Sequence, residues 1–238
     1  MYGNLDYFII VAPITILAYF ILKRLQKFDK PLLMIITLSV ILFFVRFMLI
    51  FYSSSIGVMP YVYPNLLFYS LLSILGIVFS IIYVKKVLEL DFKDIGWKFK
   101  NIKKNVIYGF LSYIPLIALF PLILYLVGLK ISFNFTWDKI ILGIEFGIIL
   151  GGFYEETMFR GVIQKYFNSI TTEKKSIIFT AITFTATHIG YLPFTGFGIY
   201  YIFVFIMALI LSFLRYKLDL LACSILHGGI VFILIIFI

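Results

Sequence analysis

The sequence predicts an all-α integral membrane protein, a bundle of about eight transmembrane helices with an interfacial helix on its cytoplasmic side. Composition is the first observation: 63% of the 238 residues are hydrophobic and 13% are charged. A soluble domain is about half apolar and about a quarter charged, so this composition excludes one. The second observation is that the apolar residues form long runs joined by short stretches, which leaves one transmembrane domain over residues 1–238.

Eight apolar runs define the expected spans, each compared with the roughly 20 residues that cross a bilayer. The runs are Tyr7–Leu22, Leu32–Tyr52, Leu66–Val84, Val106–Val127, Lys139–Phe167, Ile177–Gly190, Phe197–Tyr216 and Leu220–Ile238. The first and sixth are short. Residues 1–6 carry no basic cluster, so we expect the first run to be a retained span rather than a cleaved signal peptide.

The connections between the apolar runs alternate, along the whole chain, between those rich in lysine and arginine and those poor in them. The rich connections are 23–30, 85–104, 165–175 and 215–217, and the poor ones are 53–65, 128–138 and 191–196. Because basic connections face the cytoplasm, we expect a multi-pass protein of the cell membrane with both termini on the non-cytoplasmic side. The net charge of +9 then indicates contact with anionic lipid rather than nucleic acid, which needs a basic face with exposed aromatics.

The longest basic connection has an apolar stripe of its own. Leu88, Phe92, Ile95, Phe99 and Ile102 recur at steps of four and three, with lysines between them. That spacing predicts one amphipathic helix over about residues 86–104, lying on the cytoplasmic membrane surface. The alternative is a plain connecting loop.

Ionisable residues inside a membrane are costly and commonly functional. They are few here: Arg46, Glu145, Glu155, Glu156, Arg160, His188 and His227. Glu156 and Arg160 are four residues apart, so on a helix they stack on one face and pair. Glu155 lies about 100° around the helix, away from that arginine, and is the candidate to act on water. Glu145 is expected to snorkel or to bind Lys139.

The two histidines are expected at the same depth as Glu155. At about 1.5 Å per residue from the predicted cytoplasmic ends, Glu155 lies roughly 18 Å deep, His188 roughly 16 Å and His227 roughly 12 Å. We therefore expect one polar pocket, shared by the fifth, sixth and eighth runs. Cys223, four residues before His227, permits a Cys–His dyad, although a lone intramembrane cysteine is more often a packed apolar side chain.

A carboxylate and two imidazoles can hydrolyse an amide in two ways. In the first, Glu155 removes a proton from water while the histidines orient the water and stabilise the oxyanion. In the second, Glu155, His188 and His227 hold a zinc ion whose bound water attacks. The soluble His-Glu-x-x-His signature is absent, so the sequence does not require the metal. We therefore expect that no cofactor is required, with zinc as the alternative.

Three motifs resemble the CPBP family, the CAAX prenyl proteases and bacteriocin-processing proteins also called the Abi family. They are Glu155-Glu156-x-x-x-Arg160, Phe184-x-x-x-His188 and His227 in the last apolar run. The motif-bearing core is about residues 139–238. The resemblance implies an intramembrane endopeptidase in which Glu155 activates water, His188 positions it and His227 stabilises the oxyanion. It implies supporting roles for Glu156, Arg160 and Phe184.

One position departs from the pattern that the resemblance implies. The third motif usually has Asn or Asp four residues after its histidine, and here that residue is Val231. Ser224, three residues before His227 and on the same helix face, is the candidate to replace the missing oxyanion donor.

The sequence supports an intramembrane peptide hydrolase whose partners are the lipid bilayer and a peptide or protein substrate, with prenylated C-termini as candidates. Val231 favours the alternative of a non-catalytic protein of the same fold, acting in bacteriocin immunity or as a membrane scaffold. A transporter using the same buried groups is the third possibility, against which the lack of inverted repeats argues.

Overall fold

The computed structural model describes residues 20–21, 23–24, 31–55, 66–126, 135–189 and 198–237. Within these ranges every regular element is a helix, as the sequence predicts. Apart from Phe20 and Ile21, the first expected span lies outside the described residues.

The helices follow the predicted runs closely. They are α2 (Pro31–Ser55), α3 (Leu66–Ile82) with η1 (Tyr83–Val87), α4 (Phe92–Ile95), α5 (Ile102–Leu111), α6 (Tyr113–Leu126), α7 (Trp137–Leu142), η2 (Gly143–Glu155), η3 (Thr157–Ile163), α8 (Gln164–Ile170), α9 (Glu173–Ala186), α11 (Ile199–Lys217) and α12 (Leu220–Phe237). The η elements are π-helices, a wider form that is rare and frequent at functional sites. The predicted fifth run is thus one helical path of mixed type, from α7 through α8.

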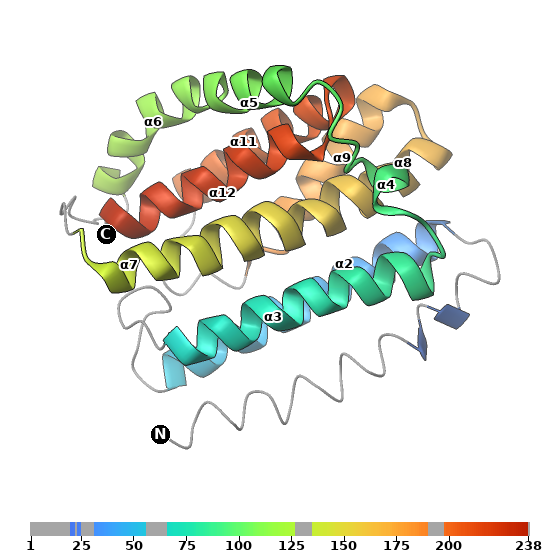
Figure 1. Ribbon diagram of the computed structural model, residues 1–238, viewed down its shortest axis with the longest axis horizontal. Helices are drawn as coiled ribbons and strands as arrows, with labels where there is room; N and C mark the ends of the chain where they lie inside the picture. Colours follow the sequence, from blue (N-terminus) through green and yellow to red (C-terminus); the bar gives the residue numbers. More distant parts are fainter. Residues whose placement is uncertain are drawn as a thin grey trace.

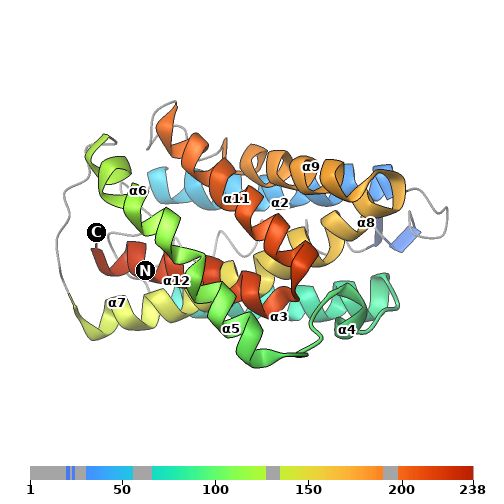
Figure 2. The ribbon, with the colours of Figure 1, turned by 90° about the horizontal axis from the view of Figure 1, so that it is seen from above.

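The long helices lie along a common direction in successive layers (Figure 1). The α7–α8 path lies between α3 on one side and α12 on the other, and its central part, η2, packs most extensively against α12 and then against α3. Helix α5 covers the far side of α12, α6 packs against α11, and from above α11 crosses α9 obliquely (Figure 2). The polar residues of η2 and η3 are therefore enclosed on opposite sides.

Three helices of the described chain are long and apolar enough to cross a membrane. These spans are Ser70–Val87, Tyr200–Lys217 and Leu220–Phe237, and Pro31–Phe43 is a shorter apolar helix. The described part of the protein is therefore helical and contains three candidate membrane-spanning helices. The count of eight spans and the side of each loop stay predictions.

Local sequence explains where several helices begin and end. Pro31 opens α2, at the position where the missing N–H costs nothing. Thr136 caps α7 by accepting from the Lys139 N–H. Asp219 lies between the end of α11 and the start of α12. Its carboxylate accepts from the Leu221 N–H at 3.0 Å, so it caps the N-terminus of α12.

Glycines set how closely η2 approaches α12. A Cβ on Gly147 would lie 2.8 Å from the Gly228 carbonyl oxygen, and one on Gly152 would lie 2.9 Å from that of Ser224. These distances are shorter than side chains tolerate, so only glycine permits this backbone contact. The contact fixes the register between the helix that carries both glutamates and the helix that carries His227.

The predicted interfacial helix over residues 86–104 is wrong. Positive φ angles at Glu89, Gly96, Phe99 and Asn101 interrupt it, and α4 is its only helical part between η1 and α5. The apolar stripe is also divided, because Leu88 and Ile95 are buried in the protein while Phe99 and Ile102 are exposed. Regular spacing alone did not reveal that half of the stripe is core.

We call residues 88–101 the strap, because they cross one end of the bundle between η1 and α5 (Figure 1). The Gly96 carbonyl accepts from the Leu220 N–H at 3.0 Å, and the Ile95 carbonyl accepts from Arg215 at 3.0 Å. Just beyond the strap, the Asn105 side chain donates to Asp219 at 2.9 Å. The junction between α11 and α12 thus anchors the strap and the start of α5.

Candidate active site

Two adjacent glutamates lie at the centre of the α7–α8 path. Glu155 ends η2, Glu156 is a single α-helical residue, and η3 begins at Thr157. Glu156 is completely buried, while 18% of the Glu155 side chain is exposed. The two carboxylates therefore have different surroundings, as the sequence predicts.

Glu156 pairs with Arg160 on the next turn, which confirms the predicted pair. Arg160 Nη1 lies 2.9 Å from Glu156 Oε1, and both side chains are fully buried. The guanidinium also donates to the Ala208 carbonyl on α11 at 3.2 Å and stacks over the Phe184 ring. Because burying an isolated charge is costly, this pairing makes a carboxylate tolerable here.

His227 lies between the two glutamates. Its Nδ1 is 2.7 Å from Glu156 Oε1, and its Nε2 is 3.8 Å from Glu155 Oε2. A carboxylate only accepts hydrogen bonds, so Nδ1 carries a proton and donates it to Glu156. The contact between Glu156 and His227 was not predicted, because it depends on the register between η2 and α12.

Phe184 joins the second histidine to this group. Its buried ring has its centroid 4.5 Å from that of His188 and 5.6 Å from that of His227. The cation of Arg160 lies 4.3 Å from the same ring. The Phe184 of the second motif is therefore the apolar wall that separates and positions the charged groups.

His188 lies beyond the last residue of α9, Ala186, rather than inside a helix as the sixth run predicted. The backbone turns after Ala186, and the His188 N–H donates to the Thr185 carbonyl at 2.9 Å. The His188 Nδ1 lies 2.8 Å from the Phe184 carbonyl oxygen. A carbonyl only accepts, so Nδ1 is protonated, and Nε2 is the acceptor nitrogen of the neutral ring.

Ser224 faces the glutamate-bearing helix at Gly152, three residues before Glu155. A Cβ on Gly152 would lie 2.9 Å from Ser224 Oγ. Val231 is half-buried on the same helix as His227. Cys223 points elsewhere: its thiol donates to the Leu211 carbonyl of α11 at 3.3 Å, so its geometry does not favour a Cys–His dyad.

The strap contributes a residue that the sequence did not single out. Trp97 Nε1 donates to Thr157 Oγ1 at 3.0 Å, and its ring lies 5.4 Å from that of Phe153. Thr157 and Phe153 flank the glutamate pair on the chain. An indole at the end of an interrupted loop gave no periodic signal, although a buried tryptophan needs a partner for its N–H.

Glu145 lies ten residues before Glu155 on the same helical path. Ser70 of α3 donates to its carboxylate, and Ser73 donates to its backbone carbonyl at 3.1 Å. The expected contact with Lys139 is therefore wrong, because α3 packs directly against this part of η2 and supplies the partner. Glu145 is not part of the site around Glu155.

The predicted zinc ligands meet only in part. Glu155 and His227 approach each other, but among the described residues no group of three or more His, Cys, Asp or Glu side chains is arranged to hold a metal ion. His188 has its Nδ1 engaged by a backbone carbonyl. The zinc route stays a prediction, and the donors as placed do not form a ready site for it.

The fold and the site define a helical membrane protein whose buried centre combines two carboxylates, an arginine and two imidazoles. Residues 136–233 match the family model described as type II CAAX prenyl endopeptidase Rce1-like. The match confirms the resemblance drawn from the three motifs and supports a relationship of this part of the chain to the CAAX proteases, a family of peptidases. No curated protein and no solved structure matches the chain significantly.

Proposed function

We propose that the protein is an intramembrane endopeptidase that cleaves peptide or protein substrates, prenylated C-termini among them, with a water activated by Glu155. One observation carries the proposal: Glu156 holds the His227 ring by Nδ1, so that Nε2 faces Glu155 at 3.8 Å. A base and a potential oxyanion donor are thus placed side by side. Arg160 cancels the charge of Glu156, so the remaining acid–base chemistry belongs to Glu155 and His227.

The reaction follows from these positions. Glu155 takes a proton from water as the water oxygen bonds to the scissile carbonyl carbon, which leaves a tetrahedral oxyanion. His227, protonated on both nitrogens, donates from Nε2 to that oxyanion while Nδ1 keeps its bond to Glu156. Glu155 then passes its proton to the leaving amine as the C–N bond breaks. Atoms and charge balance without a cofactor.

The other members of the site have supporting roles in this proposal. His188 orients the attacking water, because the Phe184 carbonyl fixes its tautomer. Ser224 is the candidate second donor to the oxyanion in place of the residue at Val231. Should zinc take part instead, Glu155, His188 and His227 would bind it, and a chelator would abolish cleavage.

Val231 supports a second candidate function. An aliphatic side chain cannot donate to an oxyanion, and losing one such donor costs about 10²–10³ in rate. A non-catalytic member of the fold, acting in bacteriocin immunity or as a scaffold, would tolerate this change. We place the endopeptidase first because the glutamate, arginine and histidine contacts are all retained.

The site would open to the cytoplasm in a multi-pass protein of the cell membrane, with both termini on the other side. The basic connections support this orientation. Labelling of single cysteines placed at residues 86 and 130, in a Cys223→Ser background, would test it. We expect an impermeant thiol reagent to label position 130 from outside intact cells and position 86 only after lysis.

The test of function compares two glutamates of one helical path. Purified protein is given a prenylated CAAX peptide and a library of membrane peptides, and cleavage is followed by mass spectrometry. We expect Glu155→Gln to lower the rate about 10²–10⁴-fold, the range for loss of a general base. Glu145→Gln is the matched control, since it removes the same charge ten residues away, and we expect it to keep the wild-type rate within about twofold.

Each outcome separates the alternatives. Cleavage that survives Glu155→Gln contradicts the assigned base. Cleavage that a chelator stops and zinc restores favours the metal route. Absence of cleavage of every substrate by wild-type protein favours the non-catalytic function.

A further inference from the structure

The outer face of the strap and the start of α5 form a strongly basic surface. We define the basic patch as Lys98, Phe99, Lys100, Ile102, Lys103 and Lys104, all of which are exposed. Between Ile95 and Trp137 the sequence contains no acidic residue. Positive charge on this surface is therefore not offset by its own segment.

Nearby lysines bind acidic or carbonyl oxygens of the protein, whereas in the basic patch the recorded side-chain contact is that of Lys104 Nζ, 5.9 Å from the Tyr108 ring centroid. Lys85 binds Asp91, and Lys165 donates to the Asp94 carbonyl at 3.1 Å. Within the described ranges, the four lysines of the basic patch make no ion pair. The apolar members of the basic patch are largely exposed: Phe99 is 55% exposed and Ile102 is 54% exposed.

The backbone holds these side chains outward at a conformational cost. Phe99 and Asn101 have φ angles of 51° and 52°, in the left-handed region that non-glycine residues rarely adopt. The conformation persists because both flanks are anchored, by Trp97 in the core and by Asn105 on Asp219. Strained backbone of this kind persists where the surroundings fix it, commonly at functional sites.

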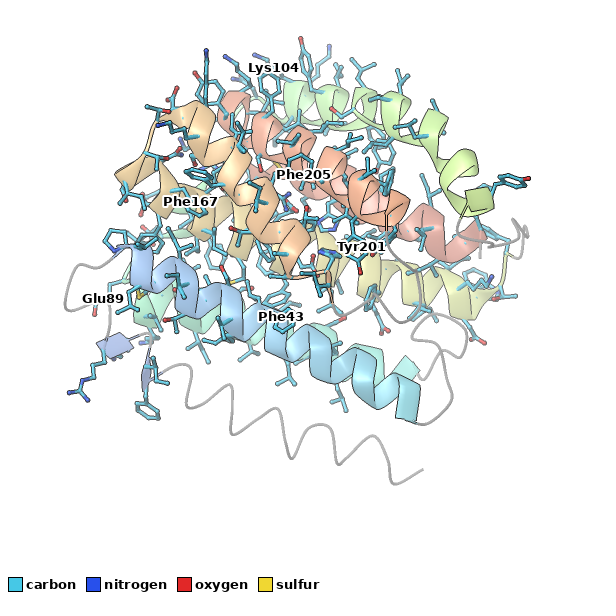
Figure 3. The ribbon with its side chains drawn as sticks, turned by 180° about the vertical axis from the view of Figure 1, so that it is seen from behind. Phe43, Glu89, Lys104, Phe167, Tyr201 and Phe205 are labelled. Carbon is cyan, nitrogen blue, oxygen red and sulfur yellow. The ribbon has the colours of Figure 1, made fainter. Side chains whose placement is uncertain are left out.

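The basic patch lies where an apolar outer surface of the bundle ends. Beyond it along α5, Ile107, Phe110 and Leu111 are 44%, 59% and 51% exposed, as lipid-facing side chains are. Figure 3 shows Lys104 projecting from the outer edge of the bundle rather than toward its interior. Lysines at the end of an apolar helix face reach the headgroup level of a bilayer.

We propose that the basic patch binds the phosphate groups of anionic phospholipids in the surrounding bilayer, with Phe99 and Ile102 inserted at the acyl boundary. Charge complementarity selects this occupant: several lysines attract an anionic leaflet, and exposed aromatic and aliphatic side chains favour an interface over water. The binding does not depend on the peptidase chemistry.

Binding at the basic patch has a route to the candidate active site. Phe99 stacks on Trp97 with ring centroids 5.9 Å apart, and Trp97 donates to Thr157, next to Glu156. Lipid that orders Phe99 would hold Trp97 against the helix that carries the glutamates. We therefore expect anionic lipid to raise thermal stability and, in an active enzyme, the rate.

The experiment uses Trp97 as a local reporter. The chain has two tryptophans, so the full-length Trp137→Phe variant in nanodiscs leaves one. Energy transfer from Trp97 is measured to dansyl-labelled phosphatidylglycerol and, separately, to the same label on phosphatidylcholine. We expect stronger transfer to the anionic lipid, reduced by high salt because the attraction is electrostatic.

Two double variants are matched for charge and helix position. K103Q/K104Q changes the second and third residues of α5, and K174Q/K175Q changes the second and third residues of α9, where Glu173 already offsets the charge. Each lysine near an anionic surface contributes roughly a fivefold factor. We expect K103Q/K104Q to lower the apparent lipid affinity by roughly 25-fold and K174Q/K175Q to leave it nearly unchanged.

Three results would overturn the proposal. Equal transfer to both lipids would show no headgroup selection. Equal losses in the two double variants would show only the overall charge of the protein. Displacement of the labelled lipid by a soluble polyglutamate peptide at low concentration would assign the basic patch to an acidic peptide instead. Unchanged melting temperatures in lipid-free detergent would confirm that both variants are folded.

Discussion

The glutamates at two positions of the α7–α8 helical path have different partners. Glu145 meets α3, and a serine hydroxyl donates to its carboxylate. Ten residues later Glu156 meets a guanidinium and an imidazole, and Glu155 faces the other nitrogen of that imidazole. The helical path and the residue type are shared, so the partners and the degree of burial make the difference. A serine hydroxyl binds one oxygen of the Glu145 carboxylate and leaves it without an acid–base partner, whereas a histidine held between two carboxylates forms an acid–base system.

The largest difference is expected when each glutamate loses its partner. Arg160→Met leaves the fully buried Glu156 with the His227 ring as its remaining partner, and removing one member of a buried pair should lower the free energy of unfolding by about 3–5 kcal/mol. Ser70→Ala removes one neutral donor from half-buried Glu145 and should cost about 1 kcal/mol. Unfolding in detergent by a denaturant series measures both. Equal stabilities for the two variants would contradict the comparison.

The site around Glu155 lacks the oxyanion donor that the family pattern has at the position of Val231. Val231→Asn restores an amide where the family pattern has a donor, and one donor to an oxyanion is worth up to about 10²–10³ in rate. We expect an increase in kcat with little change in KM, measured on the peptide that wild-type protein cleaves best. The matched variant Val231→Leu should give no increase. A gain for leucine as well would indicate a packing effect rather than a donor.

A smaller effect is expected from the charge that orients His227. Glu156→Gln keeps an oxygen that accepts from Nδ1 but removes the negative charge that favours a protonated ring, so kcat should fall about 10–100-fold, as for partners behind a reacting group. A positioning role predicts a change in kcat and in the pH–rate profile, with KM retained. Glu145→Gln is the control. A change in KM alone would show that Glu156 acts on substrate binding.

The smallest effect concerns an exposed carboxylate on the strap. The hydrogen bond and charge of Lys85, and then those of Lys93, lower the pKa of Asp91 below its usual 3.8. A lowered pKa stabilises the folded protein above the unfolded-state value, and the contribution is lost as pH falls through the folded value. Asp91→Asn should therefore reduce the decline of melting temperature between about pH 5 and pH 3. An unchanged slope would show that the pair contributes nothing.

The sequence predicted the parts of this site that depend on one helix. The pair of Glu156 and Arg160 follows from a spacing of four, and depth counting brought Glu155 and His227 to one level. It did not predict the contact between Glu156 and His227, because glycines at 147 and 152 set that register through backbone contacts. His188 was placed inside a helix because its run is apolar, but the chain turns after Ala186.

Contacts between distant segments also explain why the sequence did not predict the conformation of the strap. Alternation of apolar and basic residues over 86–104 suits a surface helix, and nothing local signals that Ile95 is buried against the bundle. The sequence does not predict the role of Trp97, because that role depends on Thr157, sixty residues away. Patterns within one segment report its own helical face, whereas contacts between segments require the fold.

On the side of the strap, the two hydrogen bonds to the α11–α12 junction are accepted by backbone carbonyl groups. The carbonyl oxygens of Ile95 and Gly96 accept both bonds, and every residue type supplies such an oxygen. Gly96 itself cannot be replaced by another residue type, because a Cβ there would lie 2.5 Å from the Arg215 guanidinium carbon. Saturation mutagenesis should therefore find the exposed positions of the strap permissive and the buried Ile95, Gly96 and Trp97 intolerant, so that relatives could diverge at the exposed positions without losing the closure.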